Sequence, residues 1–216
     1  MSPTENCPAW NASDGFDKCV PKLVVVYRSA IDTAKSKMIE LGDVKEWHGE
    51  VFDGLPPAGY EYYAGNFRQI DLNRPCLDYP VGVAGIQGSL PREVLGDTEA
   101  LFSNTRANAL SVEIKWPTLE PKQRAYHLAV VIGELVGRFI QIHPFRDGNG
   151  RMSRMLWAVA LARFGVSPQC RIHPSPNRDA PKTAYGDLMA ACMKGNFLPL
   201  QMQILRYLIV KRPTVG

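Results

Sequence analysis

The chain has 216 residues and a formal net charge of +4. Its length fits one large domain or two small ones, and it is long enough to bury a real core. Hydrophobic residues make up 45% and charged residues 21%, as in an ordinary globular protein. The charge is compatible with an anionic ligand, but it is too small and too scattered to indicate a nucleic-acid partner.

The N-terminal residues and the cysteines bear on location. The first nineteen residues are polar, and no uninterrupted apolar run is long enough to cross a bilayer, so we expect no secretory signal and no membrane partner. We expect a polar extension over 1–19 and a single domain over 20–216. The cysteines are odd in number and form no CxxC pair: Cys7, Cys19, Cys76, Cys170 and Cys192. This usage indicates reduced thiols in a cytoplasmic protein, although secretion by a dedicated injection system would leave no mark in the sequence.

The first half of the chain shows two helical patterns followed by loops. Apolar residues at three- and four-residue spacing predict a helix from Pro21 to Leu41. A shorter helix is expected over 43–52, with Asp43 as its N-cap. Glycine and proline recur after it, and the segment PVGVAGIQGSLP, 80–91, indicates a small β-hairpin. Pro91 then opens another helix, expected to end near Leu110.

The second half predicts the centre of the fold. The run 121–142 is the most apolar helix, and it should end at His143 because a residue before proline avoids the α region. A second apolar helix should start near Gly150 and run to Phe164, with Gly165 as its C-cap. Two further helices follow a proline-rich loop. The expected fold class is therefore all-α with a small hairpin, and His48 and His127 are interpreted as structural residues.

The segment IHPFRDGNGRMSR, 142–154, joins the two apolar helices. A helix N-terminus binds anions through unpaired N–H groups and a partial positive charge. The glycines of DGNG let the backbone approach a ligand closely. Arg151 and Arg154 lie three residues apart on one face, and guanidinium groups suit phosphate oxygens. Each fragment alone is an ordinary turn or surface feature, but together they predict a phosphate-binding loop.

Four other residues complete this loop. Asp147 could hold Mg²⁺, which commonly takes one or two carboxylates together with phosphate oxygens. His143 is a candidate general base because its ordinary pKa lies near 6.5. Phe145 is the apolar member, and we expect it to anchor the loop in the core. Pro144 stiffens the backbone between the histidine and the phenylalanine.

This segment resembles the Fic family signature HPFx[D/E]GN[G/K]RxxR at all nine fixed positions. The resemblance extends to WHGEVF at 47–52, to YYAGNFRQ at 62–69, which is similar to a G-x-[F/Y]-R segment, and to YGDLMAACMKGNFLPL at 185–200. The segment VGVAGIQGSLPREV, 81–94, resembles the family's flap hairpin and the proline-opened helix after it. RPCLDYP, 74–80, looks like an insertion before that flap.

The resemblance implies transfer of AMP from ATP to a Tyr, Ser or Thr hydroxyl of a target protein. His143 would take the hydroxyl proton, and Asp147 would bind Mg²⁺. Residues implied to hold the phosphates of ATP are Gly148, Asn149, Gly150, Arg151 and Arg154. Residues implied to clamp the target by strand addition are Val83, Ala84, Gly85, Ile86 and Gln87.

The resemblance leaves alternatives open. A non-catalytic Fic-fold protein would bind a nucleotide or partner without transfer, and other members could transfer UMP, GMP or phosphocholine. The inhibitory helix pattern [S/T]xxxE[G/N] is not met. Ser36 to Glu40 has the spacing but is followed by Leu41, and Thr183 to Asp187 ends in aspartate. We therefore expect weak or absent inhibition within the chain. A separate antitoxin-like chain or a homo-oligomer could restrain Arg154 instead.

Overall fold

The computed structural model describes residues 7–83, 85–166 and 184–209. Its elements are η1 (Ala12–Gly15), α1 (Phe16–Ala34), α2 (Leu41–Phe52), η2 (Glu61–Tyr63), η3 (Pro75–Leu77), β1 (Gly82–Val83), β2 (Ile86–Gln87), α3 (Pro91–Lys115), η4 (Trp116–Thr118), α4 (Pro121–Ile142), α5 (Asn149–Arg163), α6 (Ala184–Met193) and α7 (Leu198–Ile209). The expected all-α class with a small hairpin is confirmed.

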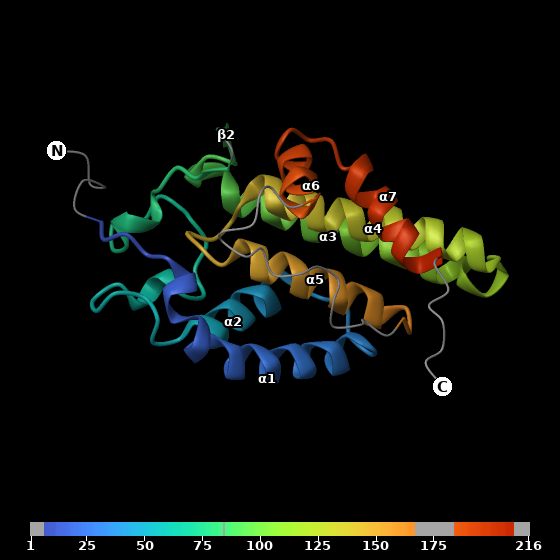
Figure 1. Cartoon of the computed structure of the whole chain (residues 1–216), viewed down its shortest axis with the longest axis horizontal. Coiled ribbons are helices and arrows are strands. Elements are labelled where there is room, and N and C mark those ends of the chain that lie inside the picture. Colours follow the sequence, from blue (N-terminus) through green and yellow to red (C-terminus); the bar gives the residue numbers. More distant parts are fainter. Residues whose placement is uncertain (1–6, 84, 167–183, 210–216) are drawn as a thin grey trace.

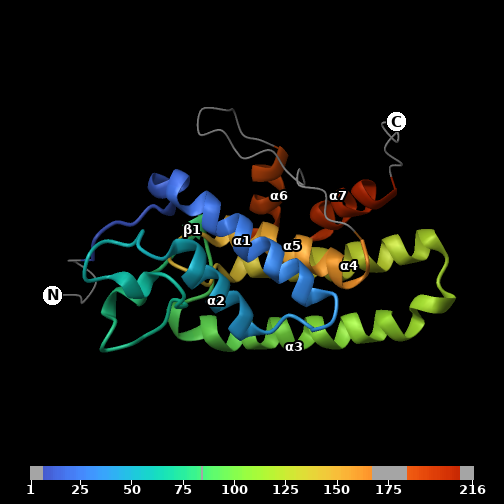
Figure 2. The ribbon, with the colours of Figure 1, turned by 90° about the horizontal axis from the view of Figure 1, so that it is seen from below.

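Helix α4 lies at the centre, as its composition predicts. It packs against α3, α5, α6 and α7, while α1 packs against α5 and α2 (Figure 1). Figure 1 shows α1 and α2 on the opposite side of α5 from α6 and α7, and the turned view places α3 on the opposite side of α4 from α6 and α7 (Figure 2). Within the described residues, α4 is the one helix long and apolar enough to cross a membrane, and 61% of its apolar window is buried. It is thus placed as a core helix.

The helix starts in the first half differ from expectation. Helix α1 begins at Phe16 and contains Pro21, so the expected division at residue 20 falls inside it. Its first turn is held by Cys19, which is fully buried in the core. Helix α2 has Glu40, not Asp43, as its N-cap. Asp43 caps from the third helical position, where its carboxylate accepts the Glu40 N–H at 2.8 Å.

Two other boundaries differ. Helix α1 ends at Ala34, so Ser36 to Glu40 lies in the connection to α2 and not inside a helix. Helix α3 runs to Lys115, beyond the expected Leu110, because Val112 remains buried on its inner face. It ends where Pro117 follows Trp116 and a short η4 begins. Thr183 lies outside the described residues.

The expectation that all cysteines are reduced is wrong. Cys7 and Cys76 form a disulfide across a sequence separation of 69 residues, which joins the N-terminal residues to η3. Cys19 and Cys192 are buried free thiols, and Cys170 lies outside the described residues. Nothing local in the sequence marks the bridged pair. Because disulfides are uncommon in reducing compartments, the thiols no longer support a cytoplasmic location.

Candidate functional site: the loop between α4 and α5

The motif loop, residues 143–148, lies at the end of the molecule where α4 stops, α5 starts and the hairpin sits (Figure 1). His143 is the C-cap of α4 and adopts the left-handed conformation, with φ 55° and ψ 60°. Among the described residues it is the one non-glycine residue with positive φ. A non-glycine residue in this region carries strain, which the surrounding contacts must hold in place.

The imidazole of His143 is held as a neutral base. Its Nδ1 lies 3.3 Å from the Ile140 carbonyl oxygen. Since a carbonyl oxygen only accepts, Nδ1 carries the hydrogen and Nε2 keeps its lone pair. Burial lowers the pKa of His143 to about 4, and the charge of Arg68 acts in the same direction, whereas the Ile140 hydrogen bond and Asp147 oppose the shift. The ring is therefore uncharged at neutral pH.

Arg68 fixes the backbone around His143. Its side chain is fully buried, and it donates to four backbone carbonyls: His143 O at 2.8 Å and Tyr79 O, Ser89 O and Ile142 O at 2.9 Å each. Its own N–H donates to Pro144 O at 2.7 Å. Burial lowers the pKa of Arg68 to about 10, which leaves it charged at neutral pH. One guanidinium thus joins the end of α4 to the chain that leaves the hairpin.

Asn149 and Phe145 hold the loop from inside. Phe145 is fully buried and stacks on His48, with ring centroids 3.7 Å apart. The Asn149 side chain, 1% exposed, accepts from Phe145 N at 2.9 Å and donates to Phe145 O at 2.8 Å. Both ends of this amide are therefore used within the loop. Any contact of Asn149 with a phosphate would come from its backbone N–H.

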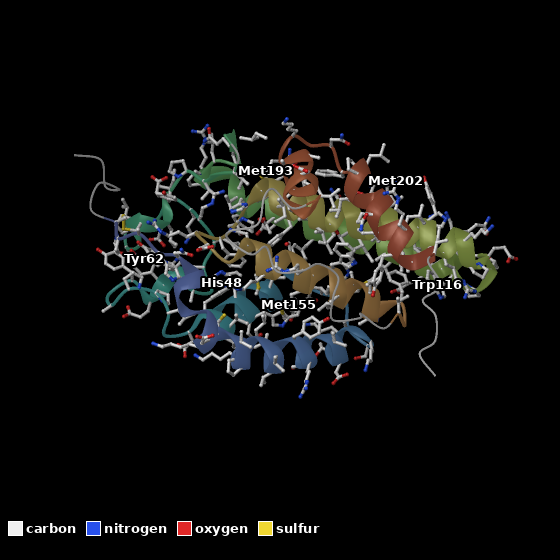
Figure 3. All side chains as sticks on the ribbon, viewed as in Figure 1. His48, Tyr62, Trp116, Met155, Met193 and Met202 are labelled. Atoms are coloured by element: carbon white, nitrogen blue, oxygen red, sulfur yellow. A yellow bond between two sulfur atoms is a disulfide. The ribbon has the colours of Figure 1, made fainter. Side chains whose placement is uncertain are left out.

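His48 is a buried structural residue that supports the loop from α2. Figure 3 shows it on the loop side of the molecule, between α2 and the α5 helix start. Its Nδ1 accepts the Gly65 N–H at 3.0 Å, so Nε2 carries the hydrogen and donates to Asp147 O at 3.0 Å. Burial lowers the pKa of His48 to about 3. The neutral ring is thus part of the folded loop.

Gly148 and Gly150 meet different constraints at the start of α5. Gly148 has φ 81°, and a Cβ there would fall 2.5 Å from Phe52 Cε2 and 2.9 Å from His48 Nε2. Glycine is required at 148 on both counts. At Gly150 the nearest atom to an added Cβ would be Arg154 Nη1 at 3.7 Å. The helix start is therefore open on that side, beside the Arg154 guanidinium.

Comparison with known proteins identifies this arrangement. A model of the Fic/DOC family matches residues 38–161, more than half of the chain. The chain belongs to the Fic/DOC family. No curated protein matches it.

Solved structures share the fold, and Fic domains are among them. One is the N-terminal Fic domain of a VirB-translocated Bep effector protein from Bartonella quintana, with 14% identity, TM-score 0.57 and coverage of 90% of this chain and 82% of that chain. Another is BepC from Bartonella tribocorum with bound AMPPNP, with 14% identity, TM-score 0.51 and coverage of 90% and 86%. A further Bartonella quintana Fic domain has bound ADP, with 14% identity, TM-score 0.53 and coverage of 96% and 92%.

The Fic hairpin lies against the end of α4. Gly82 pairs with Gln87 and Val83 with Ile86, in antiparallel register. A Cβ at Gly88 would lie 3.1 Å from the carbonyl oxygens of Gln141 and Ile142. The chain leaving the hairpin therefore passes in close contact with the residues before His143. Ala84 lies outside the described residues.

The residues Arg151 and Arg154 follow on the first turns of α5. The Arg151 guanidinium lies over the Phe52 ring, 5.4 Å from its centroid. Its charge also contributes to the lowered pKa of His48. Both arginines are half-exposed on the helix that begins at the Fic loop. The charge on the helix start thus adds to the partial positive charge of the helix itself.

The structural roles of two residues of this site could not be predicted from the sequence. Arg146 occupies the position that the family signature leaves variable. It lies between the rings of Tyr63 and Tyr79, 4.4 and 4.3 Å from their centroids. It also donates to Cys76 O at 2.7 Å and Pro8 O at 3.0 Å. Arg68 lies within the segment 62–69 that resembles the family, but its four carbonyl partners could not be read from the sequence.

Asp147 receives hydrogen bonds from two directions. Its Oδ1 accepts the Gly148 N–H at 2.5 Å, within the loop. Its Oδ2 accepts the Ala12 N–H at 2.8 Å, from a segment 135 residues away in the chain. The predicted polar extension therefore reaches the carboxylate that was expected to bind the metal. Glu40, by contrast, is engaged in the capping box of α2.

Proposed function

We propose that this chain is a protein nucleotidyltransferase that moves AMP from ATP to a Tyr, Ser or Thr hydroxyl of a target protein and releases pyrophosphate. The observation that carries the proposal is the state of His143. It is a neutral imidazole with Nδ1 engaged, held in a strained conformation immediately before an anion-binding helix start. Solved Fic domains with bound AMPPNP and ADP support nucleotide binding by this fold.

The reaction follows from a base at this position. Nε2 of His143 accepts the proton of the target hydroxyl as its oxygen attacks the α-phosphorus of ATP. A new oxygen–phosphorus bond forms, the bond to the bridging α,β-oxygen breaks, and pyrophosphate leaves. Burial keeps the free imidazole uncharged. The negative charge of a bound triphosphate would raise the pKa of His143 again, which favours proton uptake once the substrate is in place.

The phosphates would bind at the start of α5. The first N–H groups of a helix have no partner within the helix, and here they belong to Asn149 and Gly150. The open side of Gly150 leaves room for a phosphate next to the backbone. Arg151 and Arg154 would add guanidinium donors to the outer phosphates. The β- and γ-phosphates, which leave as pyrophosphate, would thus lie next to positive charge.

Asp147 is the residue that would hold Mg²⁺. Over the described part of the chain, no group of three or more His, Cys, Asp or Glu side chains could hold a metal by itself. Magnesium in nucleotide sites commonly takes one or two carboxylates together with phosphate oxygens and water, so a single carboxylate beside a phosphate site fits. Bound there, the ion would neutralise phosphate charge. Asp147 would fix the position of the nucleotide relative to His143.

The target segment would dock on the hairpin. Val83 and Ile86 pack against the core, whereas Gly82 and Gln87 are exposed. A two-stranded sheet leaves an outer edge on each strand, and an extended segment could add to it through backbone hydrogen bonds. The hairpin's contact with the end of α4 would place such a segment near His143. The proposed partner is thus a protein with an extended segment that carries a hydroxyl.

The test is mass spectrometry after incubation with ATP and Mg²⁺, alone and with cell lysate. We expect an added AMP mass on this chain or on a lysate protein. His143→Ala should reduce its formation by roughly 10²–10⁴-fold while ATP binding persists, which is the range for loss of a general base. His127→Ala, which removes a histidine near the start of the same helix, is the matched control and should leave transfer intact.

Other donors are tested in the same assay. An adduct that appears with UTP or GTP but not with ATP would change the donor and keep His143 as the base. Binding of ATP without an adduct from any nucleotide would contradict transfer and favour a Fic-fold binding protein. Equal activity of His143→Ala and the unchanged chain would reject the role of His143.

A further inference from the structure

The N-terminal segment, residues 7–12, is fastened beside the Fic loop at several points. The Cys7–Cys76 disulfide attaches it to η3. Arg146 of the loop donates to Cys76 O and Pro8 O, on both sides of that bridge. Trp10 packs edge-on against Phe52 and His48, with ring centroids 5.9 and 6.2 Å apart. These contacts place the segment across the part of the loop that carries Asp147.

The segment ends at the Asp147 carboxylate. Ala12 is fully buried, and its N–H donates to Asp147 Oδ2 at 2.8 Å. The other oxygen is held by Gly148 N. The orientation of this carboxylate is therefore set by one donor inside the loop and one donor that the disulfide holds in place. A carboxylate offers about four acceptor positions, so two donors leave room for a metal ion.

We infer that the N-terminal segment is a positioning element for the metal-binding carboxylate, and that the Cys7–Cys76 disulfide makes the Mg²⁺ requirement of nucleotide binding depend on thiol oxidation. The inference rests on the proposed role of Asp147 in holding Mg²⁺. Carboxylates that bind metals are themselves oriented by hydrogen bonds, and loss of such a partner typically weakens metal affinity about 10- to 100-fold. Ala12 acts through Asp147 and not on the substrate.

Reduction of the Cys7–Cys76 disulfide is the direct way to perturb this segment. A dithiol reductant would transfer two electrons and two protons to the bridge, which gives two cysteine thiols and the oxidised, cyclic form of the reductant. The Cys7 end of the segment would then be released from η3. The Ala12 donor would then be held against Asp147 only by the Arg146–Pro8 hydrogen bond and the packing of Trp10, and so less firmly, whereas the Gly148 donor within the loop would remain.

The experiment measures the dissociation constant of ATP as a function of Mg²⁺ concentration, by calorimetry. It compares the oxidised chain, the chain treated with dithiothreitol, and a variant with both Cys7→Ser and Cys76→Ser. We expect the Mg²⁺ concentration for half-maximal tightening to rise about tenfold on reduction and in the double variant. ATP affinity in EDTA should change little, which separates positioning from general loss of structure. Added reductant should not affect the double variant, which keeps the other three cysteines.

A second pair of variants isolates the donor. Ala12→Pro removes the backbone N–H, while Ala12→Gly keeps it and removes only the methyl group. With the disulfide verified as formed by thiol counting, Ala12→Pro should raise the Mg²⁺ requirement about tenfold and Ala12→Gly should not. An unchanged Mg²⁺ requirement in the double cysteine variant and in Ala12→Pro would overturn the inference. So would a lower requirement, which would mean that the segment competes with the metal.

Asp147→Asn separates this inference from the function on which it rests. If it abolishes the Mg²⁺ dependence while the cysteine and Ala12 variants keep it, only the positioning role fails. If it leaves the Mg²⁺ dependence unchanged, the proposed metal role of Asp147 fails and the inference falls with it. Loss of Mg²⁺ dependence in Asp147→Asn, with partial loss in the double cysteine variant and Ala12→Pro, is the expected pattern.

Discussion

The two ends of the helical bundle are held together by different forces. At the loop end, buried polar side chains contact specific backbone groups: His48, Arg68 and Asn149 are each at most 1% exposed. At the other end, which Trp116 marks in Figure 3, Ala109, Val112 and Val131 form an apolar cluster with Trp116 and Phe164. One charged contact there is a half-buried pair between Arg163 and Glu113, with Nε and Oε1 2.6 Å apart.

The two ends differ mainly in how precisely their contacts fix atomic positions, and less in how much free energy those contacts contribute. Apolar packing depends mainly on volume and tolerates small shifts. A hydrogen bond from a buried guanidinium or amide is lost when its partner moves by an ångström, and the unpaired groups then cost free energy. The loop end therefore fixes positions, which the proposed transfer reaction would require, while the apolar end supplies stability.

The largest effect is expected at Arg68. Arg68→Met leaves the carbonyls of His143, Tyr79, Ser89 and Ile142 without this donor. We expect the free energy of unfolding to fall by roughly 4 kcal/mol, measured by urea denaturation. Val131→Ala at the other end should cost about 2 kcal/mol. The nuclear magnetic resonance signals of the His143 ring should shift in Arg68→Met and not in Val131→Ala. Equal costs with an unshifted ring would remove the distinction between the two ends.

The next largest loss of unfolding free energy is expected for Gly148→Ala. The new Cβ would overlap Phe52 and His48 at a residue with φ 81°. We expect a loss of roughly 3 kcal/mol in unfolding free energy. Gly150→Ala, two residues later, meets no close atom and should be neutral or slightly stabilising. Thermal denaturation of both variants tests this, and similar melting temperatures would contradict the described packing of the loop against α2.

A fall in pH should lower the folding stability that the loop end contributes, and not that of the apolar end. Burial lowers the pKa of His48 from 6.5 in the unfolded chain to about 3. The neutral ring is favoured in the folded state, so its contribution is complete above pH 6.5 and is lost as the pH falls toward 3. By linkage this amounts to about 2 kcal/mol between pH 7 and pH 5. His48→Gln should show a correspondingly flatter pH dependence in urea denaturation, while Val131→Ala should keep the slope of the unchanged chain.

The smallest effect is expected for the ion pair of the apolar end. Arg163 and Glu113 are 22% and 26% exposed, so solvent screens much of their attraction. Arg163→Met should lower the unfolding free energy by about 1 kcal/mol or less. A loss comparable with that of Arg68→Met would mean that charged contacts position both ends alike.

Local patterns were enough to predict the centre of this molecule. Helix α4, its end before Pro144 and the helix start within DGNG follow from periodicity and from the restrictions that proline and glycine impose. The hairpin, which the structure has at 82–87, was predicted within 80–91 from short β-branched alternation broken by glycines. The loop residues lie together because they are adjacent in the chain, so their proximity needed no knowledge of the fold.

Contacts between distant residues could not be predicted. The Cys7–Cys76 bridge spans 69 residues, and the Ala12–Asp147 contact spans 135. Neither leaves a periodic or compositional signal. Helix α1 contains Pro21 because the buried Cys19 holds its first turn against the core. The partners of Arg68 are backbone carbonyls, which every residue offers, so only the folded chain could show which ones it contacts.

Arg146 has a consequence for protein engineering. A position that the family signature leaves free is here tied to Pro8 O, Cys76 O and two tyrosine rings. The conformation of residues 143–154 thus depends on contacts outside this segment. A chimera that places this loop in another Fic scaffold would also need residues 7–12 and 60–80 of this chain.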